Sequence, residues 1–139
     1  MSVDTSKFGD LSGYNVMMVD DVPINLVLVE KMLKVFNFEI RKASNGAIAL
    51  EMIQNRKPDL LLLDLMMPVM DGFELLYRIR SDESLSDIKV IVLSALNSND
   101  DIVKAFQLGA NDFITKPILM EKLVNAVATQ FEIIHFSRR

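Results

Sequence analysis

One carboxylate, Asp64, directly follows four consecutive leucines, Leu60 to Leu63, and precedes more apolar residues and a turn at Pro68. Pro58 breaks any helix arriving from upstream. A short, uniformly apolar run between such breakers is typical of a strand buried on both faces of a parallel sheet. Ligands of open parallel sheets bind beyond the carboxyl ends of the strands. We therefore interpret Asp64 as a nucleophile that accepts a phosphoryl group.

Other polar residues follow three further apolar runs in the same way. They are Asp20 and Asp21 after 15–19, Ser94 after 88–93, and Lys116 after 112–115. Two carboxylates about 4 Å apart repel by roughly 4 kcal/mol at an effective dielectric near 20, so three need a cation or a proton. Oxygen ligands without Cys or a nearby His favour Mg²⁺ or Mn²⁺ over zinc. A lysine and a hydroxyl beside them complete the groups that phosphoryl transfer to an aspartate requires.

Strands and helices must alternate to bring these residues together. The expected strands are 15–19, 38–43, 60–63, 88–93 and 112–115, and the expected helices are 24–36, 47–54, 73–80, 100–108 and 119 to about 134. Five such alternations with short connections predict a parallel sheet with helices on both faces. The fold class is therefore α/β. Among doubly wound five-stranded sheets the flavodoxin-like order 2-1-3-4-5 is the commonest, and we expect it here. Its switch point lies between the first and third strands, where Asp20, Asp21 and Asp64 meet.

Composition restricts the class of protein. A chain of 139 residues, half of them apolar, suits one domain with a full core. The absence of cysteine agrees with a reducing, cytoplasmic setting, and the charge of −4 argues against nucleic acid as a direct partner. We expect residues 1–13 to form a flexible tail, 14–136 the domain, and 137–139 its C-terminal end. The tail is neither a signal peptide nor a membrane span, and no membrane partner is expected.

Several motifs together identify a resemblance. They are Val19-Asp20-Asp21, Leu63-Asp64-Leu65-Met66-Met67-Pro68 with Asp71-Gly72, Leu93-Ser94-Ala95, and Gly109-Ala110-Asn111-Asp112-Phe113-Ile114-Thr115-Lys116-Pro117. Over roughly residues 14–131 the chain resembles the receiver domain of a bacterial two-component response regulator. The resemblance implies that Asp64 accepts a phosphoryl group from a phosphohistidine on a sensor histidine kinase or a histidine phosphotransfer protein. It also implies a signalling module that catalyses only its own phosphorylation and dephosphorylation.

The same resemblance implies roles for individual residues. Mg²⁺ is bound by Asp21, by Asp64 and by the carbonyl of Met66, and Asp20 acts through a bound water. Lys116 and Ser94 contact the phosphoryl oxygens, assisted by two backbone amides. Those amides belong to Met66 and Ala95.

The resemblance also implies a cis peptide bond and a switch. The Lys116–Pro117 bond is expected to be cis. Ser94 and Phe113 are the switch residues, and they change the face formed by helix 100–108, strand 112–115 and the last helix. That face binds an output domain or a downstream protein, or forms a homodimer.

Some alternatives stay open. Asp20 and Asp21 could simply cap the first helix. The chain could be a pseudo-receiver that binds partners without phosphorylation. A haloacid dehalogenase-type phosphohydrolase is disfavoured because position 66 is Met, where that family has a second Asp. At the C-terminal end, Ile133 and Phe136 are apolar but lie off the stripe by which the last helix packs on the sheet. Either the helix frays here, or it continues into a linker or coiled coil in which these two residues would be buried.

Two apolar residues flank the expected phosphorylation site. Met66 and Leu96 lie two positions beyond Asp64 and Ser94. Neither side chain can orient a water molecule by hydrogen bonding. The sequence therefore predicts slow self-dephosphorylation.

Overall fold

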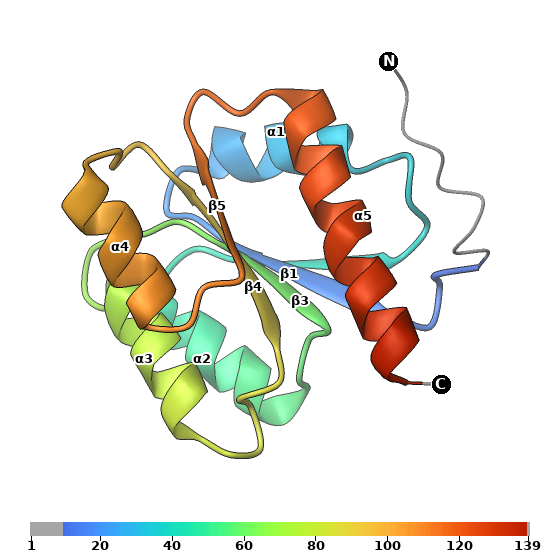
Figure 1. Ribbon diagram of the computed structural model, residues 1–139, viewed down its shortest axis with the longest axis horizontal. Coiled ribbons are helices and arrows are strands. Elements are labelled where there is room, and N and C mark those ends of the chain that lie inside the picture. The colour runs from blue at the N-terminus through green and yellow to red at the C-terminus, as the bar shows by residue number, and fades with distance from the viewer. Residues whose placement is uncertain (1–9, 139) are drawn as a thin grey trace.

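A computed structural model describes residues 10–138 as an α/β domain (Figure 1). The strands are β1 (Asn15–Val19), β2 (Glu39–Ala43), β3 (Leu60–Leu63), β4 (Lys89–Ser94) and β5 (Asp112–Thr115). The helices are α1 (Pro23–Met32), α2 (Gly46–Asn55), α3 (Gly72–Ser81), α4 (Asn99–Gln107) and α5 (Met120–Ser137). All strand pairs are parallel in the order β2-β1-β3-β4-β5. The predicted fold class and strand order are confirmed.

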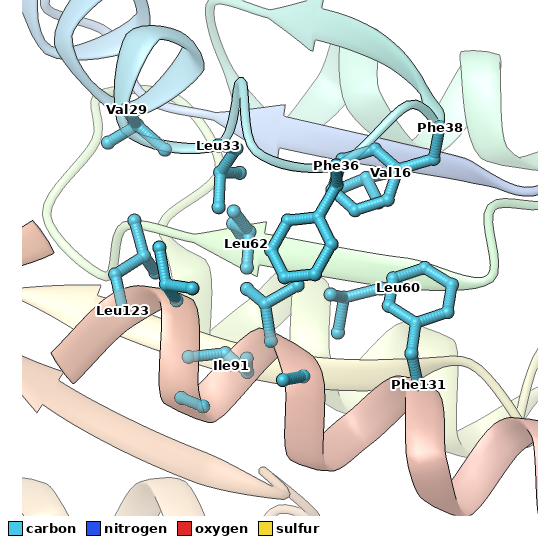
Figure 2. Close-up of a cluster of buried hydrophobic side chains, with 14 of the residues drawn as sticks. Val16, Val29, Leu33, Phe36, Phe38, Leu60, Leu62, Ile91, Leu123 and Phe131 are labelled. Carbon is cyan, nitrogen blue, oxygen red and sulfur yellow. The ribbon is translucent and has the colours of Figure 1, made fainter. Parts of the chain in front are cut away.

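Two hydrophobic clusters sandwich the sheet because side chains alternate along each strand. Leu60 and Leu62 face α1 and α5, and Phe131 of α5 lies beside Leu60 (Figure 2). Leu61 and Leu63 face the opposite layer, which α2, α3 and α4 cover (Figure 1). These four leucines are at most 1 % exposed, and each contributes roughly 1.5–3 kcal/mol through burial. The leucine strand is therefore the centre of both cores.

The strand register brings the polar residues to one edge of the sheet. The Asp64 backbone NH donates to the Val19 carbonyl (3.0 Å), which aligns Asp64 with the first residue beyond β1, Asp20. The Lys116 NH donates to the Ser94 carbonyl (2.9 Å) across β4 and β5. The four residues thus lie at the carboxyl ends of neighbouring strands.

Arg80 ties α3 to the far end of β4 and β5. Its guanidinium donates to the carbonyls of Gly109 (2.8 Å) and Ile88 (2.6 Å) and to Asn111 Oδ1 (2.9 Å). Gly109 follows α4 with φ 105°, where a side chain would be strained and its Cβ would lie 2.7 Å from Arg80 Nε. Burial lowers the pKa of Arg80 below its usual range. The hydrogen bonds of Arg80 thus hold the connection between α4 and β5 in place.

Helix α1 ends four residues earlier than predicted, at Met32 instead of Phe36. Leu33 and Phe36 are buried in the same core as α1, so the apolar residues keep a helical spacing in the sequence up to Phe36. The backbone of these two residues nevertheless forms turns and not helix. Phe36 stacks on Phe38 at 5.2 Å between ring centroids, and Phe38 stacks on Phe131 at the same distance. The apolar residues after Met32 are therefore explained by aromatic packing across the core and not by a longer helix.

Residues near both ends of the described part of the chain contact the rest of the domain. Leu11 is only 5 % exposed, and its NH donates to Asn37 Oδ1 (2.8 Å), so packing begins before residue 14. At the other end, Arg138 donates to Asp59 Oδ1 (2.7 Å). Residues 1–9 of the expected tail lie outside the described residues. Helix α5 runs through both Ile133 and Phe136 to Ser137.

Candidate functional site

Three carboxylates converge where β1 and β3 end. One oxygen from each of Asp20, Asp21 and Asp64 lies within 4.8 Å of the others. Asp20 and Asp64 are buried, at 8 % and 6 % exposed, whereas Asp21 is exposed. The predicted convergence of these acidic residues is therefore present in the structure.

Asp64 has one donor on each carboxylate oxygen. Its Oδ1 accepts from the Met66 NH (3.2 Å), and its Oδ2 lies 3.5 Å from Lys116 Nζ. Burial raises the pKa of Asp64 above its ordinary value, and the nearby charge of Asp20 acts in the same direction. The Met66 NH and the Lys116 ammonium oppose this shift. A buried carboxylate with a raised pKa at a sheet edge is a candidate functional group.

Asp20 is held by three donors. Its Oδ1 accepts from the Val22 NH (2.9 Å), and its Oδ2 accepts from Lys116 Nζ and from Asn25 Nδ2, each at 3.1 Å. The residue before α1 is Val22, so the hydrogen bond from its NH to Asp20 makes a turn ahead of the helix. No side chain among the described residues caps α1, so the capping alternative for Asp20 and Asp21 is wrong, and Asp20 instead forms this turn within the acidic cluster.

Asn25 was not among the predicted site residues. Its signal in the sequence is a polar residue five positions after Asp20, within the otherwise apolar start of α1. One turn of helix returns its side chain to the strand end.

Ser94 and Phe113 lie on neighbouring strands and on the same face of the sheet. Phe113 pairs with Val92, and Ser94 is two residues beyond Val92, so alternation gives them the same side. Ser94 is fully buried, and its Oγ accepts from the Leu96 NH (3.1 Å). Phe113 is half-buried and packs against the core beneath α3 and α4. This arrangement is compatible with the switch that the resemblance implies.

The other predicted residues surround the same edge. Ala95 is exposed after β4, and the Lys116–Pro117 peptide bond is cis. Met66, 55 % exposed, and Leu96 line a hollow of about 460 Å³ formed mainly by the segment after β3. The exposed His135 lies on α5 near the opposite end of the helix from the site.

The donor set fits a divalent cation. The Lys116 ammonium contacts Asp20 and Asp64, two of the three carboxylates in the cluster, so one positive charge meets three negative charges and part of the negative charge remains uncompensated. Carboxylate oxygens and a nearby backbone carbonyl are the ligand types that Mg²⁺ and Mn²⁺ prefer. The exposed side of Asp21 leaves room for coordinating water.

Asp64→Asn is expected to stabilise the domain at neutral pH in EDTA, raising the unfolding midpoint by a few degrees. The folded state raises the pKa of Asp64, so its protonation favours folding below the unfolded pKa, and that contribution is lost as pH rises through the folded pKa. The neutral amide removes this penalty. Thermal unfolding at several pH values checks this, because the difference between the two proteins should shrink below about pH 4. An equal or lower midpoint for the variant at pH 7 contradicts it.

Comparison with known proteins identifies the family. The family model of the response regulator receiver domain matches residues 16–128, most of the chain and all five strand ends. The chain belongs to the response regulator receiver domain family. It is 38% identical over 103 residues to response regulator PleD of Caulobacter vibrioides, covering 74% of this chain and 23% of PleD.

Two further matches support the assignment to the receiver family. The DNA-binding dual master transcriptional regulator RpaA of Synechocystis is 35% identical over 81% of this chain and 46% of its own length. The receiver domain of a signal transduction histidine kinase from Syntrophus aciditrophicus superposes with a TM-score of 0.79 at 29% identity, covering 86% of this chain and 90% of that one. The chain spans less than half the length of these two curated relatives.

None of the helices in residues 10–138 combines the length and the apolar character needed to cross a lipid bilayer.

Proposed function

We propose that this receiver domain is phosphorylated on Asp64 in a reaction that depends on Mg²⁺ or Mn²⁺. The convergence of Asp20, Asp21 and Asp64 beside Lys116 carries the proposal, because the acidic cluster needs a cation and the lysine can hold a phosphate oxygen. Asp21, Asp64 and the Met66 carbonyl would hold the ion directly, and Asp20 would act through water. When bound, the ion neutralises charge on the transferring phosphoryl group.

Asp64 is the nucleophile in this proposal. One of its carboxylate oxygens forms a bond to phosphorus while the bond between phosphorus and the imidazole nitrogen of the donor breaks, and that nitrogen keeps the electron pair. The donor is a phosphohistidine on a sensor histidine kinase or a histidine phosphotransfer protein. Lys116 leaves its contacts with the carboxylates and holds a phosphoryl oxygen. Ser94 Oγ and the amides of Met66 and Ala95 contact the other phosphoryl oxygens.

The phosphoryl group then shifts a conformational equilibrium. It binds the state in which Ser94 has moved toward it, and Phe113 fills the space that Ser94 leaves. Because Phe113 lies on β5 between α4 and α5, its movement alters the α4-β5-α5 face. That face binds an output domain or downstream protein, or a second copy of the domain. We place this activity in the cytoplasm, in a signalling module rather than a turnover enzyme.

Intact mass spectrometry tests the proposal. Incubation with Mg²⁺ and acetyl phosphate is expected to add one phosphoryl group to the protein, and EDTA is expected to prevent it. A pseudo-receiver stays unmodified under both conditions, and a phosphohydrolase releases phosphate from many substrates in repeated turnovers. Either of those results contradicts the proposal.

Met66→Asn is expected to speed loss of the phosphoryl group by roughly one order of magnitude. The side chains of Met66 and Leu96, which line the hollow after β3, cannot hydrogen-bond to a hydrolytic water, whereas an amide at position 66 would orient it. The measurement is the decay of phosphorylated protein after the donor is removed. Met120→Asn is the control, since Met120 is similarly exposed (52 %) and lies outside the hollow. An unchanged decay rate in Met66→Asn contradicts the expectation.

A further inference from the structure

Asn25 joins the first turn of α1 to the acidic cluster. Its Nδ2 donates to Asp20 Oδ2 at 3.1 Å, and Lys116 Nζ approaches the same oxygen at the same distance. Asn25 is half-buried and lines a hollow of about 250 Å³ with Asp20 and Lys116. One carboxylate oxygen therefore has a neutral donor and a charged donor.

We infer that Asn25 is a positioning residue, which holds the Asp20 carboxylate in place for cation binding when Lys116 leaves it. The inference rests on the proposed function, in which Lys116 moves from the carboxylates to a phosphoryl oxygen. After that movement, Asp20 Oδ2 keeps the amide of Asn25, and Oδ1 keeps the Val22 NH (2.9 Å). These two donors fix both oxygens of a buried side chain.

The amide is chemically suited to this task. A lysine or arginine at position 25 would neutralise part of the negative charge that attracts the cation, and a carboxylate could not donate to Asp20. A neutral amide supplies a donor without changing the charge of the cluster. Groups that orient metal-binding carboxylates in this way commonly change metal affinity when they are removed.

Starting the helix does not require this side chain. Pro23 occupies the first helical position, where its fixed φ suits the helix. The backbone NH of Asn25, which any residue except proline supplies, donates to the Val22 carbonyl (3.0 Å). The side-chain amide is thus directed to Asp20 rather than to the helix backbone.

Asn25→Leu tests the inference because leucine is close in size and cannot donate. The control is Asn125→Leu, the same replacement at an exposed position of α5. Mg²⁺ affinity is measured by isothermal titration calorimetry and stability by thermal unfolding in EDTA. Asn25→Leu is expected to weaken Mg²⁺ binding about tenfold. Its unfolding midpoint in EDTA should match that of Asn125→Leu, because Lys116 still contacts Asp20 without the ion.

Two further measurements separate positioning from a general structural role. In ¹⁵N-labelled wild-type protein, the Asn25 side-chain amide signals should move on addition of Mg²⁺, while those of Asn125 stay in place. Asn25→Gln, which keeps an amide donor on a longer side chain, should recover part of the lost affinity.

The possible failures are distinguishable. If the wild type binds Mg²⁺ and Asn25→Leu binds it equally well, the role of Asn25 is overturned and the proposed function stands. If Asn25→Leu unfolds at a lower temperature than the control in EDTA, the role is structural, and the inference is overturned. If the wild type itself neither binds Mg²⁺ nor becomes phosphorylated, the proposed function fails and the inference fails with it.

Discussion

Asp64→Asn is expected to abolish phosphorylation of the domain by acetyl phosphate and Mg²⁺. An amide oxygen at position 64 is a far weaker nucleophile than a carboxylate oxygen, while the side chain keeps its shape and its position after β3. Intact mass spectrometry of wild type and variant, treated in parallel, measures the modified fraction. The wild type should carry one phosphoryl group and the variant none.

Asp71→Asn supplies the control for that experiment. Asp71 lies seven residues later, at the N-cap of α3, where its carboxylate accepts from the Glu74 NH (2.9 Å). Asparagine caps helices about as well as aspartate, so this variant should fold and become phosphorylated like the wild type. If Asp64→Asn still became phosphorylated and Asp71→Asn did not, the acceptor would be a residue other than Asp64, and the assignment would be refuted.

Gly72→Ala is expected to destabilise the domain by about 2–3 kcal/mol, since a Cβ there would overlap the backbone of the segment that carries Asp64. An added Cβ would collide with the Asp64 carbonyl oxygen and lie 2.6 Å from Leu65 Cα. These are backbone atoms, so no flexible side chain can move aside. The Gly72 NH also donates to the Leu65 carbonyl (3.0 Å), which holds the two segments together. Urea unfolding measures the loss of stability.

The same displacement should slow phosphorylation, because it shifts Asp64 relative to Asp20 and Lys116. Gly13→Ala is the matched control, as a Cβ at Gly13 would meet no atom within 4 Å. It should leave both the free energy of unfolding and the phosphorylation rate close to those of the wild type. Equal stability of the two alanine variants would show that the segment after β3 tolerates a side chain at position 72.

The strands and their order could be predicted because their signals are local. Leu60 to Leu63 form β3 as expected, since an apolar run between breakers determines a buried strand whatever lies around it. The convergence of the residues at the strand ends could be predicted from that topology. Parallel strands place their carboxyl ends at one edge, so residues as far apart in sequence as Asp20 and Lys116 could be expected to meet, and they lie 3.1 Å apart.

What the sequence did not predict depends on contacts between distant segments. The end of α1 at Met32 reflects aromatic packing among Phe36, Phe38 and Phe131, which looks like continued helix in the sequence. Leu11 is buried by the fold although its neighbours are polar. Such outcomes depend on tertiary packing rather than on local propensity.

The segment after β3 shows the same limitation. Val69 adopts a φ of 70°, a backbone conformation that β-branched residues rarely take, and its side chain is 91 % exposed. No local sequence pattern predicts this conformation. Val69 lies between Asp64 and Gly72, where the backbone turns tightly back toward β3. The close approach of Gly72 to Asp64 likewise became visible only in three dimensions.

A crystal structure with Mg²⁺ and beryllofluoride, a mimic of the phosphoryl group, tests the central claim most directly. We predict an ion bound by Asp21, Asp64 and the Met66 carbonyl, with the mimic on Asp64 and Lys116 turned toward it. Clear density for the acidic cluster without an ion, and Lys116 still paired with Asp20, would contradict the account.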